Sequence, residues 1–429
     1  VLLLSKMSNK CSLTYILEFL EDPAYPSVGP HLKLLGYTGL WHPNLKSLVG
    51  RFKQMLFFIT ITFFFSQYIK CFIFFNADSL KLILQYAPFH MGIIKSCFFQ
   101  KDYKIWQRLI GYMSSVERNQ LALNDKKHDE IIHEYIRRNR KVSYFFWALA
   151  SFSNFSIFTE PYQKNQINVN GTSVYLKIFD GYTPFSKEPP GYYISMFIQT
   201  VLGHIVSSYV VGWDTLVVSI MIFFAGQLKI TRLYCSQMID VLNSKKSHLN
   251  IIECHRFYTT LAEYQQLFNS LISHVMFVYL VVISVNLGVC IIQIVEIHDD
   301  IATLMSSVVF VVACLIQLLL FYWYANEVTV ESTFVSYSTF QSNWPESNKK
   351  LQKEVALLGL TTGKILVFKA GPFNEMSLAT FIAVSCDIIA FFINSYGLYL
   401  LSRSVRHIAH QFCTDIDSRR TRAHLARPE

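Results

Sequence analysis

Stretches of about twenty mostly apolar residues recur along this chain and leave few folds open to it. Backbone groups cannot stay unpaired in lipid, so stretches of this length cross a bilayer as helices. Seven stretches qualify: residues 54–75, 80–99, 142–158, 192–227, 270–297, 302–324 and 376–401. The fourth exceeds one crossing and is interrupted by Gly212, Trp213 and Asp214, which predicts one long tilted or bent helix or, alternatively, two half-helices.

The composition agrees with a polytopic membrane protein of the all-α class. Of the 429 residues, 52% are hydrophobic and 16% are charged, whereas a soluble domain is about one-quarter charged. The net charge of +9 does not indicate a nucleic-acid partner, because the basic residues lie between apolar runs instead of on one surface. The sequence therefore predicts that the main partner of the surface is the lipid bilayer.

Lysine and arginine are unequally distributed between alternate loops, and cytoplasmic segments retain positive charge. Six of these residues lie in 1–53 and ten in 100–141, but only three in 159–191. We therefore expect a cytoplasmic N-terminus and, with seven spans, an extracellular C-terminus. The sequon at Asn170 predicts glycosylation of the loop placed outside. The basic tail 403–429 argues the other way, but the internal loops outweigh one terminal segment.

Two motifs that suggest enzyme chemistry do not meet its requirements. His128 and His133 are five residues apart, whereas two metal ligands on one helical face need a spacing of about four. The run from Gly359 to Lys364 is one residue short of a phosphate loop, and Ile365 stands where Ser or Thr should bind magnesium. We therefore expect no metal site, no cofactor and no enzymatic activity.

Residues 338–401 carry a set of features in a fixed order. They are a Tyr/Ser segment before Trp344, a basic amphipathic helix over 349–360, Ala370-Gly371, Met376 to Leu378, and Thr380-Phe381. This set closely resembles the C-terminal signature of insect odorant receptors. The entry segment 26–42, Asp214 and His255 also match the family, although more loosely.

The related gustatory receptors are the alternative family, but their Thr-Tyr and Gln-Phe marks are absent from the last apolar stretch. The obligate co-receptor of odorant receptors carries a much longer insertion between spans four and five. This chain therefore resembles a tuning subunit. It departs from the family at 388–392, where a Ser/Tyr-rich run is usual, and in the added tail 403–429.

The resemblance implies an odorant-gated, non-selective cation channel, assembled as a hetero-tetramer with the olfactory co-receptor. It also implies a place in the plasma membrane of olfactory sensory neuron dendrites. On this basis the chain divides into five parts: a cytoplasmic segment 1–53, six helices with an odorant pocket over 54–324, cytoplasmic anchor helices over 325–375, a pore-lining helix 376–402, and the tail 403–429.

In the family the last helix lines the pore, so we expect pore-lining side chains there. The candidates are Asp387, Ile389, Ile393, Asn394 and Tyr396. A charge in hydrocarbon is costly unless it faces water or a partner, which favours a pore or subunit contact for Asp387. A satisfied hydrogen bond between helices is an equally good reading for this carboxylate, and core packing is one for the isoleucines.

The family's pocket lies in the outer half of the bundle, where a small volatile molecule would bind mainly by apolar contacts and one hydrogen bond from His204, Thr200 or Asn154. The expected ligand-binding residues recur at helical spacing: Tyr86, Phe89, Ser151, Asn154, Phe155, Phe158, Met196, Thr200, Gly203 and His204. Ordinary helix packing or lipid contact is the alternative for each of them. For His204, a hydrogen bond that ties two helices together is the commoner role.

Two other membrane classes fit less well. A G-protein-coupled receptor also has seven spans, but its N-terminus is external and its characteristic Arg and Asn-Pro-Tyr marks are missing here. A transporter predicts internal repeats with helices broken at matching positions. No such symmetry is visible in the sequence.

Overall fold

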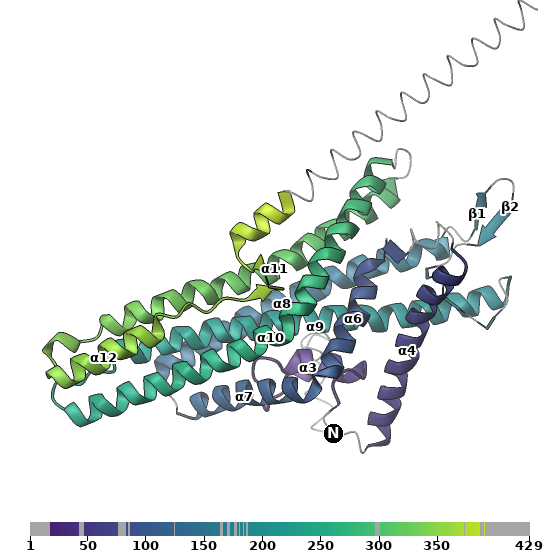
Figure 1. Cartoon of the computed structure of the whole chain (residues 1–429). Coiled ribbons are helices and arrows are strands. Elements are labelled where there is room, and N and C mark those ends of the chain that lie inside the picture. Colours follow the sequence, from purple (N-terminus) through teal and green to yellow (C-terminus); the bar gives the residue numbers. More distant parts are fainter. Residues whose placement is uncertain are drawn as a thin grey trace, which may run out of the picture.

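A computed structural model of the protein describes most of the chain. The described residues are 18–42, 47–75, 83–84, 86–123, 125–163, 166–169, 172–175, 178–179, 181–182, 184–185, 188–296, 301–372, 374–386 and 390. This part is mostly helical, with two short two-stranded hairpins (Figure 1), so the predicted all-α class is confirmed.

Within the residues that the structure describes, four helices are long and apolar enough to cross a membrane. They coincide with or overlap α4 (Leu48–Ile73), α9 (Gly191–Ser236), α10 (Ser244–Glu296) and α11 (Ile301–Phe340). The other predicted spans fall on shorter or mixed elements: α6 (Ala87–Lys101), the second half of α8 (Lys126–Gln163), and helical residues 378–386. The protein is a polytopic membrane protein, while the count of seven and the orientation stay predictions.

Helix α9 is the centre of the bundle. It runs unbroken for 46 residues, which confirms the prediction of one long helix over the alternative of two halves. In its most apolar 18-residue stretch 89% of the residues are buried, because α11, α8, α6 and α3 (Gly29–Tyr37) pack around it. At Gly212 a β-carbon would lie 2.7 Å from Leu35 Cδ2. This glycine therefore lets α3 approach α9 closely.

The long helices exceed the thickness of a membrane and project together at one end of the molecule (Figure 1). The 53 residues of α10 span about 80 Å, against about 30 Å for the hydrocarbon core. At that end α12 (Lys349–Thr362) packs on α10 and α11 (Figure 1). Tyr258 Oη donates a hydrogen bond to Lys364 O at 2.8 Å, which fastens the chain that leaves α12.

The segment that carries the family-like signature has a distinct local structure. Asn348 Oδ1 accepts a hydrogen bond from Leu351 N–H and so caps α12. After α12 the chain forms a small hairpin of β3 (Lys369–Ala370) and β4 (Asn374–Glu375). Gly371 turns this hairpin with a φ of 73°, a conformation that favours glycine. A 3-10 turn, η1 (Trp344–Glu346), joins α11 to α12.

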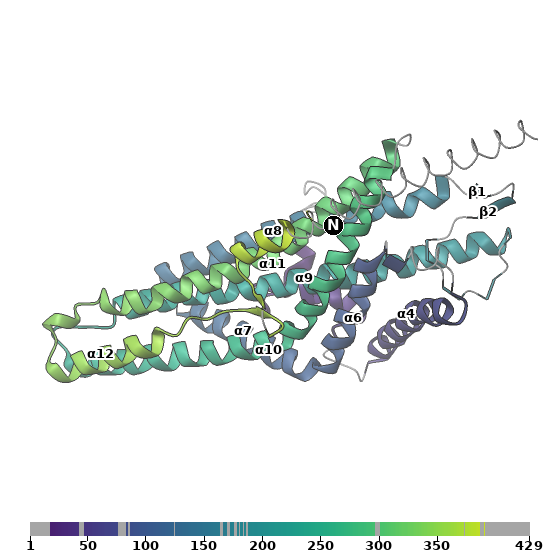
Figure 2. The ribbon, with the colours of Figure 1, turned by 45° about the horizontal axis from the view of Figure 1, so that its top comes forward.

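The opposite end of the molecule carries the other hairpin. Strands β1 (Gln166–Val169) and β2 (Thr172–Tyr175) pair antiparallel between α8 and α9. Both views place this hairpin far from α12, and both show α4 standing beside the bundle (Figures 1 and 2). Only four residues of α4 are buried, Phe57, Thr60, Phe64 and Gln67. Helix α4 therefore touches the bundle along one narrow stripe.

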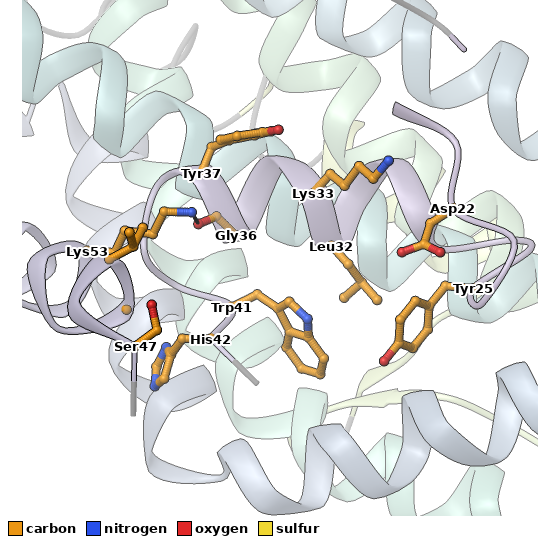
Figure 3. A pocket seen from close by; sticks show the side chains of 12 residues that line it. Asp22, Tyr25, Leu32, Lys33, Gly36, Tyr37, Trp41, His42, Ser47 and Lys53 are labelled. Atoms are coloured by element: carbon orange, nitrogen blue, oxygen red, sulfur yellow. Dashed lines mark hydrogen bonds between the residues drawn. The ribbon is translucent and has the colours of Figure 1, made fainter. Parts of the chain in front are cut away.

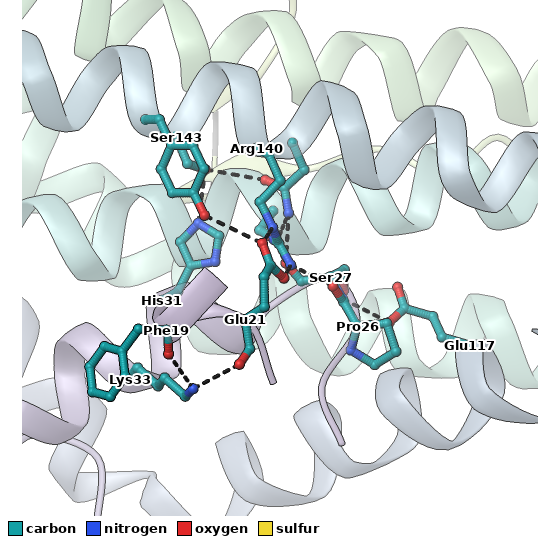
Figure 4. A network of polar contacts seen from close by, with 12 residues as sticks. Phe19, Glu21, Pro26, Ser27, His31, Lys33, Glu117, Arg140 and Ser143 are labelled. Carbon is teal, nitrogen blue, oxygen red and sulfur yellow. Dashed lines mark hydrogen bonds and ion pairs between the residues drawn. The ribbon is translucent and has the colours of Figure 1, made fainter. Parts of the chain in front are cut away.

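A polar network holds the N-terminal segment against α8 and α7 (Tyr103–Ala122), as Figure 4 shows. The Arg140 guanidinium donates to both carboxylate oxygens of Glu21 at 2.7 Å and to Pro26 O at 2.6 Å. Such bidentate pairs are among the stronger charge-assisted hydrogen bonds. The network therefore fixes the entry of the chain into α3.

Glu117 of α7 is the fully buried acid of this network. It accepts hydrogen bonds from Ser27 N–H at 3.1 Å and from Tyr135 Oη at 2.9 Å. Burial raises the pKa of this carboxyl from an ordinary 4.5 to about 7. The stabilisation that this raised pKa brings is complete below about pH 4.5 and is lost as the pH rises through about 7.

Candidate ligand site

Buried and half-buried aromatic rings gather between α4, α6, α8 and the segment that precedes α9. We call the set the Phe179 cluster; it consists of Phe63, Phe64, Tyr86, Phe89, Phe158 and Phe179. The rings meet edge to face or tilted, as aromatic pairs prefer. The cluster is therefore an apolar site made of aromatic rings.

Phe179 occupies the centre of this cluster although it comes from a connecting segment and not from a helix. Its ring centroid lies 5.0 Å from that of Phe64, 5.5 Å from Tyr86 and 5.9 Å from Phe89. The side chain is only 1% exposed, and its backbone N–H donates to Gln199 Oε1 at 3.0 Å. Phe179 thus fills the space between the helices as a plug.

One face of α9 forms the floor of the cluster. A β-carbon on Gly203 would lie 2.6 Å from Phe158 Cζ and 3.1 Å from Phe179 Cε2. Met196 lies two turns earlier on the same face and is 1% exposed. The absence of a side chain at Gly203 therefore makes room for two aromatic rings.

The structure brings together five of the ten residues predicted to bind a ligand. Tyr86, Phe89, Phe158, Met196 and Gly203 are all buried at or beside the cluster. His204 lies at the margin of the cluster. Its ring centroid is 4.8 Å from that of Phe158, but the residue is exposed.

The other four predicted residues lie apart from the rings. Ser151 and Phe155 are exposed on α8, with 67% of Phe155 accessible. Asn154 Nδ2 donates to Ser207 Oγ, and Thr200 Oγ1 is hydrogen-bonded to Tyr162 Oη at 2.9 Å. Asn154 and Thr200 thus join α8 to α9 through hydrogen bonds.

Five predicted pore-lining residues and the predicted glycosylation site lie outside the described residues. They are Asp387, Ile389, Ile393, Asn394, Tyr396 and Asn170. Their roles stay predictions.

Sequence reasoning missed several residues of the cluster, above all Phe179. The available signal was weak: an Ile178-Phe179 pair between the charged residues Lys177 and Asp180. Phe63 and Phe64 lie within a continuous run of apolar residues, and such a run does not indicate which side of the helix is buried.

A buried ion pair joins α6 to α9, further along both helices than the Phe179 cluster. Lys95 Nζ of α6 is 2.5 Å from Asp214 Oδ1 of α9, and the two side chains are 1% and 3% exposed. Asp214 Oδ2 also accepts a hydrogen bond from Gln317 of α11. The Lys95 ammonium lies 4.1 Å from the ring centroid of Tyr279, within cation–π range. The pair therefore joins α6, α9, α10 and α11.

A separate hollow of about 460 Å³ lies between α3 and the start of α4 (Figure 3). Its two lysines are already bonded to backbone carbonyls: Lys53 Nζ donates to Gly36 O at 2.6 Å, and Lys33 Nζ donates to Glu21 O at 2.7 Å. The His42 ring stacks on Tyr103 at 4.8 Å. These contacts help to dock the N-terminal segment on the bundle.

The chain is similar to known proteins over much of its length. The sequence model of the 7tm odorant receptor family matches residues 82–385. Odorant receptor 10 of Aedes albopictus is 22% identical over 304 residues, which cover 68% of this chain and 76% of that protein. Odorant receptor Or2 of Anopheles gambiae is 25% identical over 130 residues, or 30% of this chain and 34% of that protein.

Solved structures share the fold. The insect olfactory receptor OR5 from Machilis hrabei aligns with a TM-score of 0.71 and 13% identity over 85% of this chain and 95% of that one. The same receptor in complex with eugenol aligns with a TM-score of 0.71 and 13% identity over 88% of this chain and 100% of that one. At this identity the likeness establishes the fold alone.

Proposed function

The chain belongs to the 7tm odorant receptor family, and on this premise we propose that it is a tuning subunit that binds small volatile molecules in the Phe179 cluster and gates a non-selective cation pore. The observation that carries the choice of site is Phe179, a ring from a connecting segment buried among rings from helices. A receptor of the same fold has been solved in complex with eugenol, which supports a small organic ligand.

The rings suggest how binding would act on the helices. The cluster is filled by Phe179, so a ligand enters by displacing this ring or by moving it aside. Phe179 is hydrogen-bonded through its backbone to Gln199 of α9, and Phe89 belongs to α6. Displacement therefore acts directly on α9 and α6, whose inner parts are joined by Lys95 and Asp214.

We also propose the partner subunits with which this chain would form the channel. We propose a hetero-tetramer with the olfactory co-receptor in the plasma membrane of sensory dendrites, with the N-terminus cytoplasmic and seven spans. The projecting ends of α10 and α11 with α12 would then be the anchor between subunits, because they extend past the bilayer. The last helix, with Asp387 and Asn394, would line the pore.

An electrical measurement tests the proposal. Cells expressing this chain together with the co-receptor are expected to give cation currents on exposure to at least one member of a panel of volatiles. Cells with either subunit alone are the controls, and a G-protein inhibitor should leave the current unchanged. Solute uptake without current, or a current that needs G protein, would show that the chain has another function.

A further inference from the structure

Two buried polar side chains beside the Phe179 cluster carry nitrogen atoms without a hydrogen-bond partner among the described residues. His90 of α6 is 5% exposed and Gln67 of α4 is 3% exposed. Among the described residues, neither ring nitrogen of His90 has a partner, nor does Gln67 Nε2. Buried polar groups in native proteins are almost always paired, so unpaired ones need an explanation.

The His90 ring contacts Phe64 of the cluster, and Gln67 lies on the same face of α4 as that ring. The His90 ring centroid lies 5.5 Å from that of Phe64, and Phe64 in turn is 5.0 Å from Phe179. Gln67 follows Phe64 by three residues on the buried stripe of α4, which places the two on one helical face. The unpaired groups therefore lie one ring away from the central plug.

We propose that Gln67 and His90 form a polar subsite that recognises an oxygen acceptor, such as the carbonyl of a ketone, aldehyde or ester, on an otherwise apolar ligand. This inference rests on the proposed function and specifies its ligand class. The Gln67 amide supplies two N–H donors and a neutral His90 supplies one. Rings on one side and donors on the other would orient the molecule.

The energetic reason is the cost of a buried donor without a partner. A ligand carbonyl accepts a hydrogen bond from a buried donor that otherwise has no partner, whereas a hydrocarbon of the same shape leaves that donor unpaired. Sites built to hydrogen-bond a ligand group therefore reject analogues that lack it. We expect the ratio of half-maximal concentrations, hydrocarbon over ketone, to be at least about ten for the wild-type receptor.

The test uses pairs of volatiles with one carbon skeleton, one a ketone and one a hydrocarbon, on the receptor with its co-receptor. His90→Leu and Gln67→Leu each remove donors and should bring the ratio towards one. His90→Asn keeps an N–H donor and should keep part of the preference. Both ligands are applied to the same cells, so a loss of folded receptor cancels in the ratio.

Matched substitutions at exposed positions serve as controls. His274→Leu and Gln266→Leu make the same chemical changes on the outside of α10 and should leave the ratio unchanged. A ratio that collapses in at least one of the two subsite variants supports the inference. A wild-type ratio near one, or a ratio unaffected by both variants, overturns it. Absence of any volatile-evoked current from the wild type contradicts the proposed function itself.

Discussion

Replacing Asp214 with alanine is expected to lower the amount of folded receptor at the cell surface at least about tenfold. The substitution leaves the Lys95 ammonium buried without its carboxylate partner, and it also removes the acceptor of the Gln317 amide. Breaking a buried ion pair by removing one partner costs roughly 3–5 kcal/mol, a large share of a typical stability. Surface biotinylation of intact cells measures the effect.

A double variant separates the missing charge partner from the missing volume. Lys95→Met with Asp214→Leu replaces both charges by apolar side chains, and it should recover most of the surface level. Asp240→Ala is the matched control, because its ion pair with Lys246 is exposed and should matter little. Surface levels of Asp214→Ala equal to those of Asp240→Ala would refute the structural role of the pair.

Replacing Phe179 with alanine is expected to make the receptor at least about tenfold more sensitive to ligands that fit the vacated space. The wild-type ring fills the cluster and competes with the ligand, whereas the variant leaves an apolar cavity of the kind that binds small aromatic molecules. The measurement is the half-maximal concentration for a volatile that activates the wild type, in cells expressing the co-receptor.

The control for this prediction is an equal substitution on the outer surface. Phe155→Ala removes the same side chain from the exposed face of α8 and should not change sensitivity. The cavity in Phe179→Ala will also destabilise the fold by a few kcal/mol, so responses are compared at equal surface levels. Equal or lower sensitivity of Phe179→Ala relative to Phe155→Ala argues against the plug.

Hydrophobicity alone predicted the all-α membrane class, because lipid demands long apolar stretches whatever their neighbours are. The stretch 192–227 was predicted as one long helix, and α9 is one. The projection of α10 over 53 residues was less visible, since its first half is mixed in polarity and gains its helical order from packing on α9 and α12.

Contacts between distant positions could not be predicted in the same way. Lys95 and Asp214 are 119 positions apart, and nothing in the local pattern pairs them. Phe179 was missed because its segment has no helical or strand periodicity, and its burial depends on the packing of four helices.

The stripe predicted on α8 illustrates a related limit. Helical spacing places Ser151, Asn154, Phe155 and Phe158 on one side of the helix, but spacing does not fix how a helix is rotated about its axis. Phe158 turns inwards while Phe155 faces outwards. The border of the buried face runs through the middle of the predicted stripe.

Labelling with a photoreactive ligand tests the central claim most directly. An analogue of an activating volatile that carries a diazirine is crosslinked to the purified receptor with its co-receptor, and the labelled peptides are identified by mass spectrometry. The account predicts label within residues 86–91, at Phe158, at Phe179 or within 196–203, and its loss in the presence of excess unlabelled volatile. Competable label confined to other parts of the chain, such as the projecting ends of α10 and α11, would contradict it.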